Sequence, residues 1–350
     1  MKALVLSGGG ARGAFEAGVI ASLQSAGPFD IICGTSAGAI NGAFAAQGAY
    51  ADLASVWSTI ASRNPIQLVP QVQHLENLIG DIAGAATDPI FKRVGDAMKA
   101  VAEWFEIGSK AELLSLLGAI NPVPIATILR QHVRFSDLQR TLILTATNIS
   151  MRTADTYYHF LPASPISADF AAKSKPGIKR IPITSDNYAQ VVQASTSIPG
   201  AFTPVILPIN GVPCQYVDGG VANNTPIGQA IDAGADEVFI VFMDPKGGAT
   251  SPQDAANLLQ LGFACLDVMQ TKILEDDLKL ALTYNQALNA PLDPTSVIAK
   301  KRPVVLWEVR PSVPLPVTVL QFDQQKLLDA AYQLGLTAGK NPVRCELQSD

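Results

Sequence analysis

The sequence is poor in charged residues, and neither sign of charge dominates. Asp, Glu, Lys and Arg make up 16% of its 350 residues, against about 25% in a typical globular chain. With 25 basic and 30 acidic residues the formal net charge is −5, and no cluster of Lys or Arg forms the basic footprint of a nucleic-acid site. The 48% hydrophobic content excludes a disordered chain, and the charge balance argues against a nucleic-acid partner.

Long uninterrupted apolar runs are also missing. A spanning helix needs about 20 predominantly apolar residues, but residues 31–51 are broken by polar residues and glycines, and residues 188–217 by four prolines. The apolar run at residues 3–6 is shorter than the ~7 to 15 residues of a signal-peptide core. We therefore expect a cytoplasmic protein without a signal peptide or transmembrane segment, whose contact with membranes is peripheral.

Cysteine and histidine are scarce. The four cysteines, at positions 33, 214, 265 and 345, are far apart and show no C-x-x-C spacing. This pattern argues against a zinc site or a disulfide framework and fits a reducing compartment. The three histidines are His74, His132 and His159, so few residues are available for catalysis by imidazole.

Strand and helix patterns alternate in the first fifty residues. Residues 3–7 and 29–33 are apolar and predict strands, and each is followed by a glycine-containing turn and a helix, at 11–25 and up to about 47. Such alternation predicts an α/β fold with a mainly parallel sheet covered by helices. Further strands are predicted at 140–148, 155–161, 205–209, 215–218, 237–243 and 304–309, and helices at 254–288 and 323–338.

No internal repeat and no linker rich in Pro, Gly or Ser divides the chain. We predict a single α/β domain over residues 1–350, with a core at 1–62 and 134–245. Residues 63–133 form a helical insertion or lid, supported by the helical spacing of Val94, Met98, Val101 and Phe105. Residues 246–350 form a C-terminal extension of helices and a strand.

A glycine turn follows the first predicted strand. The segment SGGGARG at 7–13 matches G-x-G-x-x-G through Gly8, Gly10 and Gly13, the fingerprint of dinucleotide-binding folds. Its backbone N–H groups face an anion, either a pyrophosphate or a developing oxyanion. A nicotinamide site also needs an acidic residue at the end of the second strand, where this chain has CGTS at 33–36. A dinucleotide-binding oxidoreductase using Gly8 to Gly13 stays open as the alternative.

A G-x-S-x-G sequence, GTSAG at 34–38, lies between the second strand and the next helix. The small residues Gly34 and Gly38 permit the sharp, strained turn that exposes a nucleophilic Ser36 hydroxyl above the sheet. The helix N-terminus there favours developing negative charge. The alternative interpretation is a serine N-cap flanked by glycines that serve packing.

A serine nucleophile needs a base. In α/β-hydrolases the order is Ser, acid, His, yet no histidine follows His159, which lies in an aromatic run typical of a structural residue. Asp218, with Gly219 and Gly220 after it, ends a predicted strand, and the carboxyl ends of parallel strands share one edge of a sheet. A Ser36–Asp218 dyad follows if burial raises the Asp218 pKa above its usual ~3.9. A plain turn at 218–220 is the alternative.

In order and spacing, these motifs resemble those of the patatin-like phospholipase family. The resemblance rests on the glycine turn at 8–13, the elbow at 34–38 and the DGG at 218–220, with further likeness in ASTSIP at 194–199 and NNTPI at 223–227. It covers about residues 1–245, with the insertion unmatched. It implies a three-layer α/β/α fold and a lipid acyl hydrolase of phospholipase A or lysophospholipase type, with no metal and no cofactor.

By this resemblance, Ser36 is the nucleophile and Asp218 the general base, acting through an acyl-enzyme. The N–H groups of Gly8, Gly9 and Gly10 form the oxyanion hole, with each donor worth about 3 kcal/mol in other hydrolases. The implied partner is a phospholipid or other acyl-ester lipid, and no protein partner is indicated. A catalytically inactive carrier or storage protein on the same fold is a further alternative.

The remaining motif residues are Arg12, Gly13, Gly34, Gly38, Gly219 and Gly220. For Arg12 two interpretations stay open, namely contact with a lipid phosphate and a structural salt bridge.

Overall fold

Buried strands and helices alternate in the computed structural model, which describes residues 1–63, 67–68, 120–121, 123–162, 169–172, 174, 177–199, 201–246, 258–288, 291, 295 and 302–346. The strands are β1 Lys2–Leu6, β2 Ile31–Gly34, β3 Gln67–Leu68, β4 Ile120–Asn121, β5 Thr141–Asn148, β6 Thr153–His159, β7 Arg180–Pro182, β8 Val205–Ile209, β9 Val212–Asp218, β10 Glu237–Val241, β11 Val305–Val309 and β12 Val343–Arg344. The α-helices are α1 Gly13–Leu23, α2 Ala37–Gln47, α3 Tyr50–Thr59, α7 Val123–His132, α8 Asp169–Ala172, α9 Tyr188–Ser195, α10 Ile227–Asp232, α11 Leu258–Ala287 and α12 Gln325–Ala338.

The central sheet is mostly parallel, as predicted. Its order in the described part of the chain is β12-β11-β10-β1-β2-β5-β6-β7, with β8 and β9 attached beside β5. From β11 to β5 the neighbouring strands are all parallel. Antiparallel pairs occur towards the two ends, between β11 and β12, between β5 and β6, and between β5 and β9.

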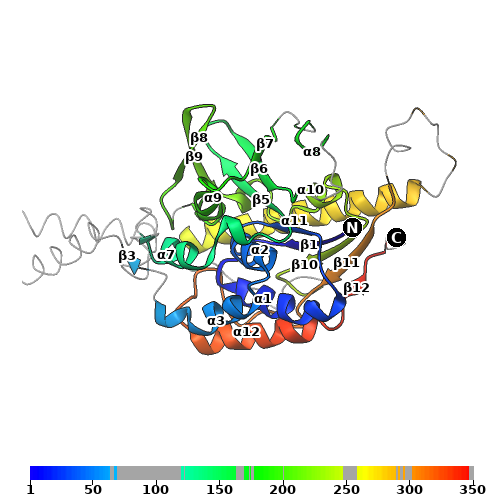
Figure 1. Ribbon diagram of the computed structural model, residues 1–350. Coiled ribbons are helices and arrows are strands. Elements are labelled where there is room, and N and C mark those ends of the chain that lie inside the picture. The colour runs from blue at the N-terminus through cyan, green and yellow to red at the C-terminus, as the bar shows by residue number, and fades with distance from the viewer. Residues whose placement is uncertain are drawn as a thin grey trace, which may run out of the picture.

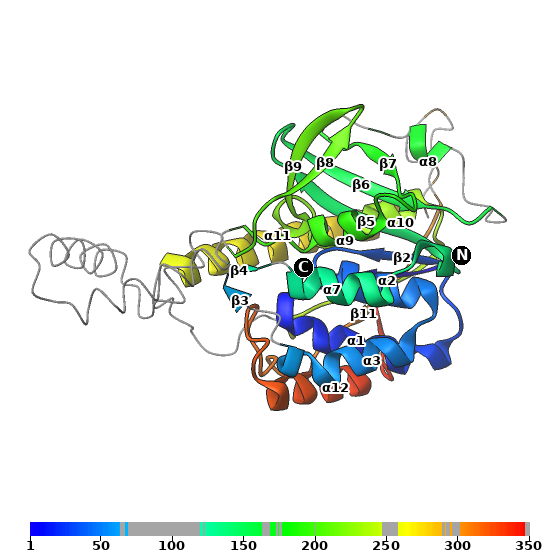
Figure 2. The same ribbon diagram turned by 60° about the vertical axis from the view of Figure 1, so that its left-hand side comes forward.

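Both faces of the sheet are covered, which explains the nearly continuous apolar strands. Along β1, Leu4 and Leu6 point into a core shared with α1, α2, α3 and α12, whereas Ala3 and Val5 point into a second core shared with α10 and α11. In Figures 1 and 2, α1, α3 and α12 lie together below the sheet, and α11 crosses the molecule above them. The result is the predicted three-layer α/β/α arrangement.

The register of β5 brings two strand ends together. The parallel strand β2 stops at Gly34, opposite Leu144 of β5. The antiparallel strand β9 then occupies the same edge of β5 from the other direction and stops at Asp218, opposite Ala146. Since only Thr145 lies between these two registers, the ends of β2 and β9 meet almost head to head.

This register corrects the reason inferred from the sequence for the position of Asp218. We expected Asp218 at the functional edge because it ends a strand of a parallel sheet. Strand β9 is in fact antiparallel to β5, and Asp218 reaches the end of β2 because β5 extends four residues past the β2 pairing. Position along β5, and not strand direction, places this carboxylate.

Other differences concern the segments between strands. The short elements β7, α9 and α10 have no counterpart in the predictions, because α9 and α10 have only eight and six residues and leave little room for a period. In the 63–133 region the structure describes the β3–β4 pair and α7, while the predicted helical spacing from Val94 to Phe105 lies outside the described residues. The first four residues of the predicted helix 254–288 also lie outside them.

Within the described ranges, none of the helices combines the length and apolar character needed to cross a bilayer.

Candidate active site

Ser36 lies at a strained turn between β2 and α2. Its φ of 57° and ψ of −125° fall in a region where residues other than glycine are rarely found. The flanking glycines are needed for close approach: a Cβ on Gly34 would overlap the carbonyl of Gly38, and a Cβ on Gly38 would overlap the backbone of Leu6. The Ser36 N–H donates to Ser195 Oγ at 3.0 Å. Ser36 therefore lies at a sharp strand-to-helix turn that the two glycines permit.

Asp218 lies against the Ser36 hydroxyl. Ser36 Oγ donates to Asp218 Oδ2 at 2.6 Å, and both side chains are buried, since each residue is only 5% exposed. Asp218 Oδ1 accepts the N–H of Gly220 at 2.8 Å, at the start of a short 3-10 turn, Gly219–Val221. Burial raises the pKa of Asp218 to about 7, although the hydrogen bonds from Ser36 and Gly220 oppose the change.

The end of β2 is tied to the segment that follows Asp218. The hydroxyls of Thr35 and Thr145 are hydrogen-bonded to each other, and both lie within hydrogen-bond distance of the Asn223 carbonyl, at 3.1 and 3.2 Å. Gly219 is packed so tightly on β5 that a Cβ there would overlap the Thr145 carbonyl. These contacts fix Ser36 and Asp218 relative to one another.

The glycine turn runs beside Ser36 and is held from two sides. The Gly8 N–H donates to the carbonyl and the side-chain oxygen of Asn224, at 3.2 and 3.1 Å. After Gly10, which has a φ of +55°, the N–H of Ala11 donates to the Val319 carbonyl at 2.8 Å. Among the described residues, no acceptor is bonded to the amides of Gly9 and Gly10. Gly8 therefore differs from the other two predicted donors, because its amide is already engaged.

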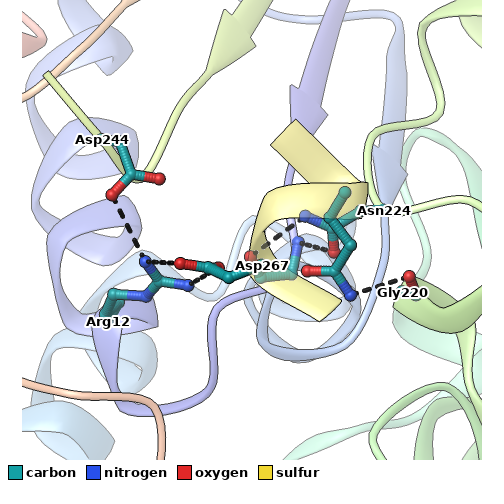
Figure 3. Close-up of polar contacts among 7 residues, drawn as sticks. Arg12, Gly220, Asn224, Asp244 and Asp267 are labelled. Atoms are coloured by element: carbon teal, nitrogen blue, oxygen red, sulfur yellow. Dashed lines mark hydrogen bonds and ion pairs between the residues drawn. The ribbon is translucent and has the colours of Figure 1, made fainter. Parts of the chain in front are cut away.

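Arg12 forms salt bridges at the start of α1. Its guanidinium is bonded to Asp267 on α11 at 2.6 Å and to Asp244 after β10 at 3.4 Å, and Figure 3 shows it between these two carboxylates. Of the two interpretations of Arg12, the structure contains the salt bridge. Helix α11 makes a second contact with the site, because Gln270 Nε2 donates to the Gly220 carbonyl at 2.7 Å.

Two recesses meet at Ser36. A cleft of mixed character contains the glycine turn, Ser36 and Asp218, together with the polar residues Arg12, Asn224, Asp267 and Gln270. Its apolar lining residues are Ile198, Pro199, Val221 and Val319. An apolar pocket also reaches Ser36, and its walls come from α2, α3 and α7 and from later loops. Its apolar side chains are Ala37, Ile40, Val56, Trp57, Ile60, Ile125, Ile128, Leu129, Ile198, Phe202 and Phe322. Gly13 lies behind this wall, where a Cβ would overlap the ring of Trp57.

His159 lies away from this arrangement. It is on β6, opposite Leu142, and packs edge to face on Phe135 with ring centroids 4.7 Å apart. Burial lowers its pKa, and no hydrogen bond or ion pair joins it to Ser36 or Asp218 in the described structure. Nor do the described residues include a group of three or more His, Cys, Asp or Glu side chains able to hold a metal ion.

Several residues of the site were not assigned a role from the sequence. Ser195 and Asn224 lie in the segments ASTSIP and NNTPI, whose likeness to the family was the available signal. Asp267, Gln270 and Val319 lie far beyond those segments, and no motif marks them. They join the site through tertiary packing alone.

Comparison with known proteins defines the family. A model of patatin-like phospholipases matches residues 4–231, well over half of the chain, so this chain belongs to the patatin-like phospholipase family. The match contains both the glycine turn and the elbow. It supports a lipid hydrolase and not the dinucleotide-binding oxidoreductase.

Individual relatives are more distant or match over short stretches. The chain is 62% identical over 47 residues to lysophospholipase nte1 of Aspergillus terreus (strain NIH 2624 / FGSC A1156), a match that covers 13% of this chain and 3% of that protein. The chain thus spans a small fraction of that relative's length. Among solved structures it is similar to VipD from Legionella pneumophila, with a TM-score of 0.34 and 17% identity, over 99% of this chain and 68% of the other.

Proposed function

We propose that this protein is a serine lipid acyl hydrolase, of phospholipase A or lysophospholipase type, that works through an acyl-enzyme formed by Ser36 and Asp218. The observation that carries the proposal is the buried 2.6 Å hydrogen bond from Ser36 Oγ to Asp218 Oδ2, at a strained turn opening onto an apolar pocket. Family membership supports the same chemistry. The substrate is an acyl-ester lipid, presented by peripheral contact with a membrane.

In the acylation step, Ser36 Oγ attacks the ester carbonyl carbon while its proton passes to Asp218. A carboxylate with its usual pKa is too weak a base for this transfer, and a pKa near the working pH suits it better. Burial brings the pKa of Asp218 to about 7. The ester C–O bond then breaks, and Asp218 returns the proton to the departing alcohol oxygen.

The developing oxyanion needs N–H donors that are free before the reaction. The amides of Gly9 and Gly10 meet this need within the described structure, whereas the Gly8 amide is bonded to Asn224. We therefore assign the oxyanion hole to Gly9 and Gly10, with Gly8 holding the turn in place. Loss of one such donor costs about 3 kcal/mol in other hydrolases.

In the deacylation step, a water molecule attacks the acyl-enzyme carbonyl and gives a proton to Asp218. The C–O bond to Ser36 breaks, the fatty acid departs, and the proton returns to Ser36 Oγ. The acyl chain lies in the apolar pocket throughout, which leaves the cleft beside the glycine turn, with Arg12, Asn224 and Gln270 in its lining, for the alcohol portion of the lipid.

Two assays test this function: labelling by a fluorophosphonate probe, and release of fatty acid from a panel of lipids. We expect probe labelling and turnover in the wild type, loss of both in Ser36→Ala, and loss of turnover in Asp218→Asn with the fold retained. His159→Ala is the control and should retain turnover. Full activity in Asp218→Asn together with loss in His159→Ala would restore a histidine triad and overturn the dyad.

Two further outcomes would refute the proposal. Labelling of Ser36 without turnover on phospholipids, lysophospholipids, galactolipids or short esters would identify a carrier or storage protein on this fold. A clear thermal shift with NAD(P) or a flavin, without any labelling, would favour the dinucleotide alternative.

A further inference from the structure

The apolar pocket beside Ser36 includes a residue from the last part of the chain. Phe322 lines this pocket and is 9% exposed. Its ring stacks on Trp57 of α3, with centroids 6.3 Å apart and an angle of 16° between the planes. Trp57 lines the same pocket and is 4% exposed. A stacked pair of buried rings therefore forms part of the wall.

The Trp57 ring is fixed on several sides. Its Nε1–H donates to Asn41 Oδ1 at 2.8 Å, and the fully buried Asn41 is itself held by Gly13 and Glu16, since its Nδ2 donates to the Gly13 carbonyl at 2.9 Å and to Glu16 Oε2 at 3.0 Å. The ring also lies directly on Gly13. Because Trp57 cannot turn away without breaking these contacts, it forms a rigid surface against which Phe322 stacks.

The segment that contains Phe322 is held by contacts with the glycine turn. Three residues before it, the Val319 carbonyl accepts the N–H of Ala11, and a Cβ on Gly10 would overlap Val319. Phe322 itself donates its N–H to the Leu320 carbonyl at 3.0 Å. The same short segment therefore contacts the proposed oxyanion turn and the wall of the pocket. It lies beyond residue 231, where the family match ends.

From these contacts we infer that Phe322, stacked on Trp57, sets the length of acyl chain that this protein accepts. The inference rests on the proposed function, and it assigns chain-length selection to a segment outside the family match. A rigid ring pair blocks further methylenes, whereas a flexible side chain would yield. The acyl specificity of this chain is then a property of its C-terminal third.

The test is the dependence of kcat/KM on acyl length for p-nitrophenyl esters from four to sixteen carbons. Each methylene buried in the pocket raises kcat/KM about fourfold, so the wild-type profile rises with length until the chain meets the rings and then levels off. In Phe322→Ala the rise should continue for about two to four more carbons, since the deleted ring leaves a cavity. Phe322→Leu should give an intermediate profile, and Ile128→Phe, which fills the same pocket, should end the rise earlier.

Phe29→Ala is the matched control. Phe29 is a similarly buried phenylalanine, 7% exposed, which packs on Phe239 and is not among the residues of the apolar pocket. Its loss should leave the shape of the length profile unchanged. Fluorophosphonate labelling measures the fraction of competent enzyme in each variant, so that differences in folding are removed from kcat.

The outcomes separate the two proposals. If the wild type neither labels nor hydrolyses any ester, the proposed function fails. If the wild type is active but Phe322→Ala and Phe322→Leu both keep the wild-type length profile, only the present inference is overturned. The same holds if Phe29→Ala shifts the profile as much as Phe322→Ala does.

Discussion

Removing the charge of the proposed base should stabilise the fold. Asp218 is buried, and burial raises its pKa from 3.8 to about 7. The ionised form of Asp218 is thus less favourable in the folded protein than in the unfolded chain. At about 1.4 kcal/mol per pKa unit, the difference is up to about 4 kcal/mol. Asp218→Asn removes this cost and keeps both contacts of the side chain, because its oxygen accepts from Gly220 and its NH₂ donates to Ser36 Oγ.

The direction of the pH effect follows from proton binding. Between pH 3.8 and about 7 the folded protein binds a proton at Asp218 that the unfolded chain has lost. The stability contributed by this group is therefore fully present below pH 3.8 and is lost as the pH rises through about 7. The asparagine variant has no such loss. Its advantage over the wild type should be small near pH 4, grow from pH 4 to 7, and stay constant above that.

Thermal unfolding at a series of pH values measures this difference. With about 2 cal/mol/K of unfolding entropy per residue over 350 residues, the full effect corresponds to a Tm increase of up to about 6 °C at pH 8. Asp186→Asn, at an exposed carboxylate, is the control and should show no comparable increase. A Tm difference that is independent of pH, or an asparagine variant less stable than the wild type at pH 8, would refute the reasoning.

Three further predictions concern the same site. On a short-chain ester, kcat/KM should fall with decreasing pH and be half-maximal near pH 7, because the proposed mechanism needs the carboxylate form of Asp218, whose pKa is about 7; an apparent pKa near 4 would contradict this. Gly10→Ala and Gly27→Ala both place a Cβ at positive φ, which costs about 1–2 kcal/mol, but only Gly10→Ala also meets Val319. Gly10→Ala should therefore lower the free energy of unfolding in urea by a further ~1–3 kcal/mol and also reduce activity. Equal losses of stability in Gly10→Ala and Gly27→Ala would argue against close packing of Gly10 on Val319. Arg12→Met removes the salt bridges to Asp267 and Asp244, and should lower the free energy of unfolding by about 1–3 kcal/mol and reduce kcat. Lys272→Met, at an exposed ion pair with Asp276, is the control and should change neither the stability nor kcat. An unchanged Arg12→Met variant would show that α11 does not support the glycine turn.

The N-terminal half of the site could be predicted because its signals are local. A strand, a glycine turn and a helix N-terminus are written within a few neighbouring residues, so the turn at 8–13 and the elbow around Ser36 follow from spacing alone. The sheet could be predicted for the same reason, since strands buried on both faces are apolar throughout. The structure contains strands β1 and β2 and the start of helix α2 where the sequence predicts them.

The remainder depends on contacts between distant segments. The position of Asp218 follows from the register of β9 on β5, which no local pattern encodes. The engagement of the Gly8 amide depends on Asn224, and the state of Arg12 depends on Asp267, 255 residues away in the sequence. Phe322 lies in an irregular segment without periodicity. Such residues become recognisable only when the chain has folded.

The head-to-head ends of β2 and β9 also have a consequence for the time at which activity arises. Ser36 and Asp218 are 182 residues apart, so a nascent chain that has emerged only to residue 217 contains the elbow without the proposed base. Contacts at such separation form late, because a long loop must close before they do. The wall completed by Phe322 comes later still. A protein proposed to cleave membrane lipids would in this way be inert until synthesis has passed residue 218, and its hydrolytic activity would report on the folding of the segments that meet at this site.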